Sequence, residues 1–438
     1  MRSAIVFVAV TLLLAGSLSA QTWYVKHDGS GDQPTIQAAV DAAASGDTIL
    51  LANGTFTGDG NRDIEFFYSW VTVRSEAGDP SYCTIDCGGS VSEPHLAFDV
   101  TFGGDAPVVI EGITITNGYG LGAGAMYVGK MASEPCTTVV RHCLFQGNET
   151  AWSGGAIMVT DDCWLMLDSC TFVGNTTVSG GAIYLGDNTA LSANACHFAE
   201  NQAINDYGGA IYGYNSACTL NNCVFVDNFA TDGGGAIFIS DGGALGLYTC
   251  SFFGNSAASS GGAIYASGSN LAMNSCVSLH NVCGHDGVGA SIYCSEGSTA
   301  YIASSTFVAD SAAAVIYCGP SVSPTLNQTV IAFAKDGAAL ACFPPAGTPT
   351  LVCCDIYGNE LGDYTDCIAA QAGVNNNISQ DPRFCDIPGE DLSYEDCSPC
   401  LAANSPCGYD IGAVAYVGCG CGEAAVPTTW GAIKALYR

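Results

Sequence analysis

Two short motifs recur through the middle of this chain and keep one shared period. The first is a tetrad, Gly-Gly-Ala-Ile, which occurs at 154–157, 180–183, 208–211, 234–237 and 261–264. The second is Phe-x-x-Asn, whose phenylalanines are 27, 26, 27 and 27 residues apart, at Phe145, Phe172, Phe198, Phe225 and Phe252. Two motifs that stay in phase at one short period indicate a stack of structural repeats, in which each unit contacts only its neighbours.

Each period is built from short strands. About three apolar runs of roughly three to five residues alternate with Gly, Asn, Asp and Ser, so a period has no room for a helix. Such a unit buries its apolar face only when it stacks on its neighbours, with equivalent positions about 4.8 Å apart. The sequence therefore predicts an all-β parallel β-helix, a solenoid of roughly a dozen coils from Ile64 to Asn359 and roughly 50–60 Å long.

Several columns at the repeat spacing are predicted to point into the coil. The position after the Gly pair is small and the next is aliphatic, as in Ala182 and Ile183. A cysteine precedes each repeat phenylalanine by two residues, and residues i and i+2 of a strand share a face. We interpret these cysteines as a ladder of small buried hydrophobic residues, with disulfides between coils as the alternative. The ladder comprises Cys143, Cys170, Cys196, Cys223, Cys250 and Cys276.

The C-terminal part of the chain is rich in cysteine. An exported chain with 24 cysteines favours disulfides, and the irregular context here suits bridges that staple a cap. For the pair Cys397 and Cys400, a metal or redox site is the alternative. The disulfide candidates are Cys353, Cys354, Cys367, Cys385, Cys397, Cys400, Cys407, Cys419 and Cys421.

The chain divides into five segments. Residues 1–20 have the charged start, apolar stretch and small-residue end of a signal peptide, with an uncleaved anchor as the alternative. In residues 21–62, a short amphipathic helix over 34–43 would plug the first coil through Ile36, Ala39, Val40 and Ala43. Repeats fill 63–345, Cys-rich coils and the C-terminal cap fill 346–418, and 419–438 form a linker and a tail that is either frayed or a sorting signal.

The charge balance excludes some partners. The formal net charge is −31, which argues against nucleic acid and anionic membranes because both need basic patches. After the first 20 residues, no apolar run is long enough for a membrane helix. The acidic residues suit solubility in an exported protein, and the alternative is Ca²⁺ binding at the surface. No other cofactor is expected.

The alternating Gly-Gly-Ala-Ile and Phe-x-x-Asn units resemble the repeats of the polymorphic outer-membrane protein family. That family is part of the right-handed, pectate-lyase-like β-helix superfamily. The similarity is strongest over 122–310 and extends weakly to both sides. It implies a right-handed β-helix and a secreted or cell-surface protein of the outer membrane, often adhesive. The superfamily also includes polysaccharide lyases and hydrolases.

The residues do not favour catalysis. No Lys or Arg occurs between His142 and Ala334, so the central coils lack the cation that elimination from a uronate needs. The weak catalytic candidates are Asp187, Asp241 and Arg141, with the two aspartates about 10 Å apart at two coil spacings. Ordinary turn chemistry is the alternative for both aspartates. His197 lies between inward Cys196 and Phe198, so we expect it at the surface.

One column suggests binding. The residue after each inward aliphatic position is usually aromatic, and the expected ribbon contains Tyr127, Tyr184, Tyr212, Phe238, Tyr265, Tyr293 and Tyr317. Exposed aromatic strips bind sugars or proteins, although such a ribbon also stabilises a sheet face by itself. We therefore predict a secreted, non-catalytic rod for adhesion to a glycan or a cell-surface protein. A polysaccharide lyase or glycoside hydrolase and a structural spacer are the alternatives.

Overall fold

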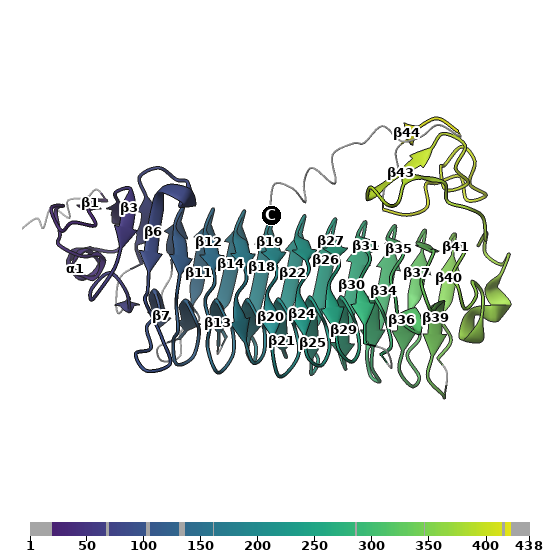
Figure 1. The fold of residues 1–438 in the computed structure, drawn as a ribbon, viewed down its shortest axis with the longest axis horizontal. Helices are drawn as coiled ribbons and strands as arrows, with labels where there is room; N and C mark the ends of the chain where they lie inside the picture. The colour runs from purple at the N-terminus through teal and green to yellow at the C-terminus, as the bar shows by residue number, and fades with distance from the viewer. Residues whose placement is uncertain are drawn as a thin grey trace, which may run out of the picture.

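The computed structural model describes residues 20–66, 70–101, 106–130, 136–160, 162–284, 287–345, 347–413 and 417–421. Over these residues the chain winds as a long solenoid whose coils pass through three parallel sheets (Figure 1). The predicted all-β parallel β-helix is therefore confirmed. The expected signal peptide up to residue 19 and the tail from residue 422 lie outside the described residues.

Three long sheets form the walls of the solenoid. Sheet 1 has 13 strands: β1 (Thr22–Val25), β2 (Thr48–Leu51), β5 (Thr72–Ser75), β8 (Val108–Glu111), β11 (Thr137–Arg141), β14 (Trp164–Asp168), β18 (Ala190–Asn194), β22 (Ala217–Asn221), β26 (Ala244–Tyr248), β30 (Asn270–Asn274), β34 (Thr299–Ala303), β37 (Thr325–Asn327) and β40 (Thr350–Val352). Sheet 2 has 12: β3 (Gly54–Phe56), β6 (Cys83–Asp86), β9 (Thr114–Thr116), β12 (Leu144–Gln146), β15 (Thr171–Val173), β19 (His197–Ala199), β23 (Val224–Val226), β27 (Ser251–Phe253), β31 (Val277–Leu279), β35 (Thr306–Val308), β38 (Val330–Ala332) and β41 (Asp355–Tyr357). Sheet 3 has 11: β4 (Ile64–Glu65), β7 (Phe98–Thr101), β10 (Met126–Gly129), β13 (Ile157–Val159), β17 (Ile183–Leu185), β21 (Ile211–Tyr214), β25 (Ile237–Ser240), β29 (Ile264–Ser267), β33 (Ile292–Cys294), β36 (Ala314–Cys318) and β39 (Ala338–Cys342).

Two smaller sheets complete the strands. Sheet 4 lies between sheets 2 and 3 in the central coils and contains β16 (Thr176–Thr177), β20 (Gln202–Ala203), β24 (Phe229–Ala230), β28 (Ser256–Ala257) and β32 (Val282–Cys283). Sheet 5 belongs to the C-terminal part and contains β42 (Phe384–Asp386), β43 (Asp391–Glu395) and β44 (Val417–Cys419). In the pairings of the named strands, all neighbours are parallel except β42 and β43.

The Gly-Gly pair is explained by the close approach of successive coils. The first glycine of the pair has a positive φ, as at Gly208 (+72°), which L side chains rarely adopt. A Cβ on the second glycine, Gly209, would lie 2.0 Å from the carbonyl oxygen of Gly235 in the next coil. The repeat therefore needs glycine at both positions, one for its dihedral angle and one for space.

The repeat phenylalanines and asparagines form two continuous inner columns. Rings from Phe145 to Phe252 stack with centroids 4.8 to 4.9 Å apart. The asparagines Asn148, Asn175, Asn201, Asn228, Asn255 and Asn281 are fully buried. Their amides bond the backbone and the side chains of neighbouring coils, as in Asn201 Nδ2 to Asn228 Oδ1 at 3.0 Å. The column therefore joins the coils rather than only shaping each turn.

The N-terminal end is closed by the predicted helix, α1 (Ile36–Ala42). The Thr35 hydroxyl caps it by accepting a hydrogen bond from Ala38 N at 3.2 Å. Ile36, Ala39 and Val40 are buried and belong to the main core. None of the helices in the described residues combines the length and apolar character needed to cross a membrane.

The C-terminal part closes the other end and then turns back. The 3-10 helix Asp366–Gln371 buries Ile368 in the main core and is tied to β39 by the Cys342–Cys367 disulfide. Sheet 5 lies instead along the side of the solenoid, near β31 and β35 (Figure 1). Its residue Tyr394 shares an apolar cluster with Val308 of sheet 2, and Ala413 N donates to the Thr306 hydroxyl at 2.9 Å. The part of the chain that follows this helix thus covers some of the outer face of sheet 2.

Candidate functional site

An aromatic column lies on the outer face of sheet 3. Successive strands hold these side chains in register, and neighbouring rings from Tyr184 to Tyr317 have centroids 4.7 to 5.9 Å apart. The column consists of Tyr127, Met158, Tyr184, Tyr212, Phe238, Tyr265, Tyr293 and Tyr317. Met158 interrupts the aromatic sequence, so the continuous ribbon begins at Tyr184. The sequence-predicted residues are therefore brought together, apart from Tyr127.

The ribbon is less exposed than the sequence suggested. Its tyrosines are half-buried, and Phe238 is only 6% exposed because the ring of Tyr207 stacks on it at 4.3 Å. Burial raises the pKa of Tyr212 and of Tyr265 to about 12. The expectation of an exposed side chain is wrong at Phe238, because a loop residue outside the repeat covers it.

A groove on the outer face of sheet 1 is a second candidate site. It has a volume of about 520 Å³ and crosses five consecutive strands, β22, β26, β30, β34 and β37. Its floor is made of small side chains in register, including Thr219, Gly246 and Ala272. Tyr301 continues the same column and is 48% exposed, so its side chain stands above the small residues at one end. The groove thus forms where the outward side chains of sheet 1 are small, next to the larger side chain of Tyr301.

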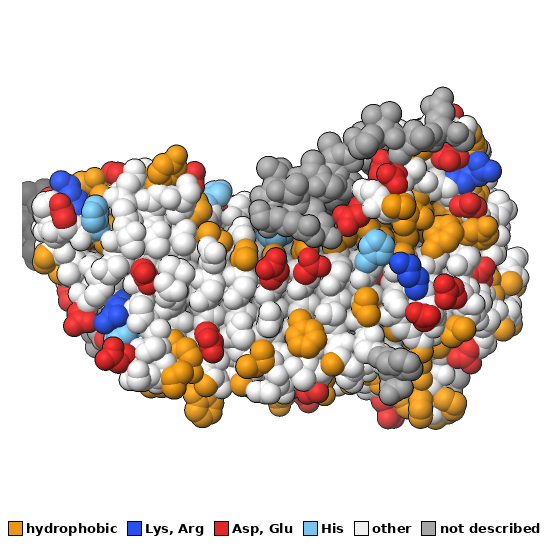
Figure 2. Space-filling view, in the orientation of Figure 1, with side chains coloured by type: hydrophobic (Ala, Val, Ile, Leu, Met, Phe, Trp, Pro, Cys, Tyr) orange, Lys and Arg blue, Asp and Glu red, His pale blue; other side chains and the backbone are white. Residues whose placement is uncertain are grey.

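The described residues that line this groove are uncharged. Hydroxyl and amide groups of Asn270, Thr299 and Thr325 line it beside alanine and glycine, and no Asp, Glu, His, Lys or Arg is among the described lining residues. Among the described side chains, Figure 2 shows acidic residues scattered over the viewed face and Lys and Arg toward its two ends. We did not predict this site from the sequence. The sequence signal was a recurrence of small residues at spacings of 27 and 26, from Thr219 to Gly246 and Ala272, without a chemical motif to mark it.

The two candidate aspartates lie in turns that join sheet 3 to sheet 1. In these turns, Asn188, Asn215 and Asp241 each have a positive φ (56°, 41° and 56°). Asp187 directly precedes Asn188, and its Oδ1 accepts a hydrogen bond from Asn215 Nδ2 at 2.5 Å. The predicted pairing of Asp187 with Asp241 across two coils stays a prediction. Asn and Asp tolerate the left-handed conformation, so turn geometry accounts for these residues.

Arg141 lies apart from both aspartates. It is the last residue of β11, is exposed, and stands in register between Glu111 and Asp168 of the neighbouring strands. Asp187 and Asp241 lie in turns that lead into sheet 1 from sheet 3, at the other end of its strands. The structure thus does not bring the three catalytic candidates together into one site.

His197 is not at the surface. It is 7% exposed on β19, where Ala199 belongs to the second apolar cluster together with its neighbour Val226 of β23. Burial lowers the pKa of His197 to about 4, so the ring is neutral near pH 7. The alternation of the strand does direct it outward, but sheet 2 has a covered outer face, which the repeat pattern alone does not reveal.

Five disulfides are present in the described residues. They join Cys136 to Cys163, Cys342 to Cys367, Cys353 to Cys407, Cys385 to Cys419 and Cys397 to Cys421. Seven of the nine C-terminal candidates are therefore paired. Cys354 and Cys400 are buried free thiols instead. Cys400 Sγ donates to Asp355 Oδ2 at 3.2 Å, and burial raises the pKa of Asp355 to about 7.

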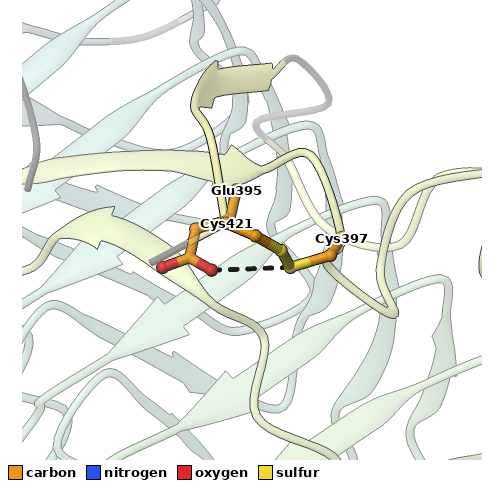
Figure 3. Close-up of side chains that lie close together, drawn as sticks. All are labelled: Glu395, Cys397 and Cys421. Atoms are coloured by element: carbon orange, nitrogen blue, oxygen red, sulfur yellow. Dashed lines mark hydrogen bonds between the residues drawn. A yellow bond between two sulfur atoms is a disulfide. The ribbon is translucent and has the colours of Figure 1, made fainter. Parts of the chain in front are cut away.

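One group of side chains in the C-terminal part has metal-ligand types. Glu395, Cys397 and Cys421 place their ligand atoms within 4.8 Å of one another (Figure 3). The two sulfurs are joined in a disulfide, so they are not the thiolates that zinc requires. Arg383 contacts Glu395 Oε2 at 3.2 Å and Cys397 Sγ at 3.0 Å. The disulfide and the Arg383 contacts therefore indicate a structural role for this group. Ca²⁺ binding at surface carboxylates stays a prediction.

Comparisons with known proteins bear on the fold. The family described as a right handed beta helix region matches residues 97–252 and 155–331, which span more than half of the chain. No curated protein matches the sequence. The catalytic unit of a thermostable GH87 α-1,3-glucanase from Streptomyces thermodiastaticus strain HF3-3 is 14% identical, covers 78% of this chain and 70% of its own, and has a TM-score of 0.39.

Two further solved structures are more distant. The A-module of the Azotobacter vinelandii mannuronan C-5 epimerase AlgE6 is 11% identical over 80% of this chain and 95% of its own, with a TM-score of 0.33. A PL6 family alginate lyase is 9% identical over 77% of this chain and 76% of its own, with a TM-score of 0.24. These similarities concern the fold alone.

Proposed function

The chain belongs to the right-handed β-helix region family, and from that premise we propose that it is a non-catalytic rod that binds an uncharged glycan chain. The observation that carries this proposal is the groove of about 520 Å³ on sheet 1, which crosses five coils and is lined by uncharged residues. Ligand sites commonly have volumes of about 300–1,000 Å³. Four strand spacings make the groove about 20 Å long, which suits several units of an extended polymer.

The lining supports a neutral ligand rather than a polyanion. Hydroxyl and amide groups can exchange hydrogen bonds with sugar hydroxyls, and the exposed ring of Tyr301 offers an apolar face at one end. The net charge of −31 repels acidic polymers, and the described groove residues contain no cation to offset it. An uncharged polysaccharide is therefore the class of ligand that fits best.

The same chemistry disfavours cleavage of that ligand. Hydrolysis of a glycosidic bond usually needs two carboxyl groups about 5–9.5 Å apart, and none lines the described groove. Arg141 and the two aspartates stand at opposite ends of the sheet 1 strands. We therefore propose binding rather than catalysis, and the lyase or hydrolase alternative stays open to the assay described below.

We also propose that the protein works outside the cytoplasm, at the cell surface. Five disulfides suit an oxidising compartment, and residues 1–20 have the pattern of a signal peptide. The Gly-Gly-Ala-Ile and Phe-x-x-Asn repeats are similar to those of polymorphic outer-membrane proteins, which favours an adhesive role. A rod with one long binding face suits attachment to a polymer.

Replacing Tyr301 by alanine is expected to weaken binding to a neutral polysaccharide about tenfold, since an aromatic contact contributes roughly 1–1.5 kcal/mol. The measurement is affinity electrophoresis against immobilised neutral and acidic polysaccharides. Tyr214→Ala is the matched control, because Tyr214 is 41% exposed but lies on sheet 3 outside the groove. Equal affinity of wild type and Tyr301→Ala would contradict the proposal.

Two further readouts separate the alternatives. Loss of binding in a Tyr184→Ser, Tyr212→Ser, Tyr265→Ser protein, with Tyr301→Ala unaffected, would move the site to the sheet 3 ribbon. Formation of unsaturated products or new reducing ends would show an enzyme and overturn the non-catalytic reading. Folding of every variant is checked by thermal melting, because the ribbon tyrosines are half-buried and their replacement costs stability.

A further inference from the structure

Six cysteines form one uninterrupted column where sheet 1 turns into sheet 2. Each lies directly before the first residue of a sheet 2 strand, from β12 to β31, and each is at most 1% exposed. Ile113 ends the column on one side and Ser305 on the other. The column, which we call the thiol ladder, consists of Cys143, Cys170, Cys196, Cys223, Cys250 and Cys276, all unpaired in this structure.

The coils hold these sulfurs next to one another. The residues that follow the ladder cysteines are in register, as Leu144 with Thr171 and His197 with Val224. Neighbouring thiols interact along the ladder, and Cys250 N also contacts Cys276 Sγ at 3.4 Å. Parallel strands lie about 4.8 Å apart, which falls within the Cα–Cα range of about 4.4–6.8 Å found for disulfides.

A disulfide with this same relationship is already present. Cys136 and Cys163 each lie directly before an in-register pair, Thr137 with Trp164, and their Cα atoms are 4.7 Å apart. They link the same two coils that hold the first two cysteines of the thiol ladder. The stacking distance of this solenoid therefore accommodates a disulfide between adjacent coils, with both cysteines at one position of the repeat.

We propose that the thiol ladder is a modification site, oxidised in neighbouring pairs to Cys143–Cys170, Cys196–Cys223 and Cys250–Cys276. This is the pairing of neighbours that uses all six cysteines. In each pair, one thiolate attacks the disulfide of an oxidant, protein or small molecule, and one sulfur of that oxidant leaves as a thiol. The neighbouring thiolate then displaces the second sulfur, so one S–S bond forms, and the two protons of the cysteines end on the two sulfurs of the oxidant, which is reduced to two thiols.

Because the ladder cysteines are buried in the folded protein, we place this oxidation during folding, before the coils have stacked. Burial raises the pKa of the Cys143 thiol to about 12, so little thiolate of this cysteine exists in the folded protein near neutral pH. Each Sγ also donates to a backbone carbonyl, as Cys276 does to Asn274 O at 3.3 Å. The exchange therefore takes place while coils are still being added to the stack. Once formed, the three bonds would tie coils in pairs through the middle of the rod.

The test counts free thiols in protein recovered from an oxidising compartment, unfolded at acidic pH and alkylated without reductant. Cys223→Ala is expected to take up one more alkyl group than wild type, because any pairing of the remaining five ladder cysteines leaves one free. Cys218→Ala is the matched control and should take up one fewer, since buried Cys218 has Leu191 and Leu245 as its register neighbours. One fewer group in both variants would overturn the proposal.

The wild-type protein provides a second measurement that does not depend on a variant folding. The stretch from His142 to Ala334 contains no Lys or Arg, so a protease that cleaves after acidic residues is used without reduction. A linked pair of peptides 188–200 and 207–227, which persists in the Cys218→Ala protein, supports Cys196–Cys223. Recovery of these peptides unlinked, or linked to peptides of other coils, overturns the proposed pairing.

Discussion

Replacing Asn201 by alanine is expected to destabilise the fold by about 4 kcal/mol or more, because it leaves several buried groups without partners. Asn201 Nδ2 donates to Phe172 O and to Asn228 Oδ1, both at 3.0 Å. Its Oδ1 accepts from Asn175 N at 3.1 Å and from Asn175 Nδ2 at 2.9 Å. All of these groups are buried, so water does not replace the lost bonds.

The measurement for Asn201→Ala is the midpoint of urea unfolding, together with native-state hydrogen exchange. A solenoid need not unfold in one step, so exchange shows whether the loss is confined to neighbouring coils. Asn194→Ala is the control. Asn194 is exposed, and its side-chain amide donates to Asp168 Oδ1 and accepts from Asn222 Nδ2. A similar small effect for both variants would show that the buried column contributes little.

Replacing Asp310 by asparagine is expected to stabilise the protein at pH 7 by about 3 kcal/mol. Asp310 takes the asparagine position of the repeat and is fully buried, with Oδ1 accepting from Asn281 N at 2.7 Å. Two other columns change in the same place: Ser278 stands between Phe252 and Phe307, and Ser291 takes an alanine position. Both serine hydroxyls donate to Asp310 Oδ2, but burial still raises its pKa from 3.8 to about 6.

The pH dependence follows from the sign of that shift. The folded protein binds the Asp310 proton more tightly than the unfolded chain, so wild-type stability falls as pH rises from about 4 to about 6. Asp310→Asn lacks this loss, and its serine partners can act as donors or acceptors. The difference in unfolding free energy should be near zero at pH 4 and largest above pH 6. The buried Asp355 contributes equally to both proteins at each pH and cancels.

Unfolding is followed in urea at pH 4, 5, 6 and 7. Asp227→Asn is the control, because Asp227 is exposed in a turn of a neighbouring part of the rod. A pH-independent difference between Asp310→Asn and wild type would contradict the assignment, as would destabilisation at pH 7. The first result would mean that Asp310 is ionised throughout, and the second that its hydrogen bonds outweigh the burial of charge.

The sequence alone determined the repeating part of the structure. A column repeated at one period identifies its own position in the coil, because each copy lies directly on the next. That is why the inward Ile183, Phe198 and Cys196 were placed correctly, and why α1 was found from its apolar face. The same logic placed the tyrosines of sheet 3 on the outside and in register.

Only the tertiary structure decided what covers the outside of the rod and which outer positions stay open. Phe238 is buried by Tyr207, and His197 lies on a covered sheet, through contacts that no repeat encodes. The bond from Cys353 to Cys407 and the return of sheet 5 along sheet 2 join segments far apart in the chain. The groove beside Tyr301 arises where small side chains from five strands meet. These features depend on the packing of non-repeating segments and on side-chain volume, whereas periodicity specifies only the direction in which a side chain points.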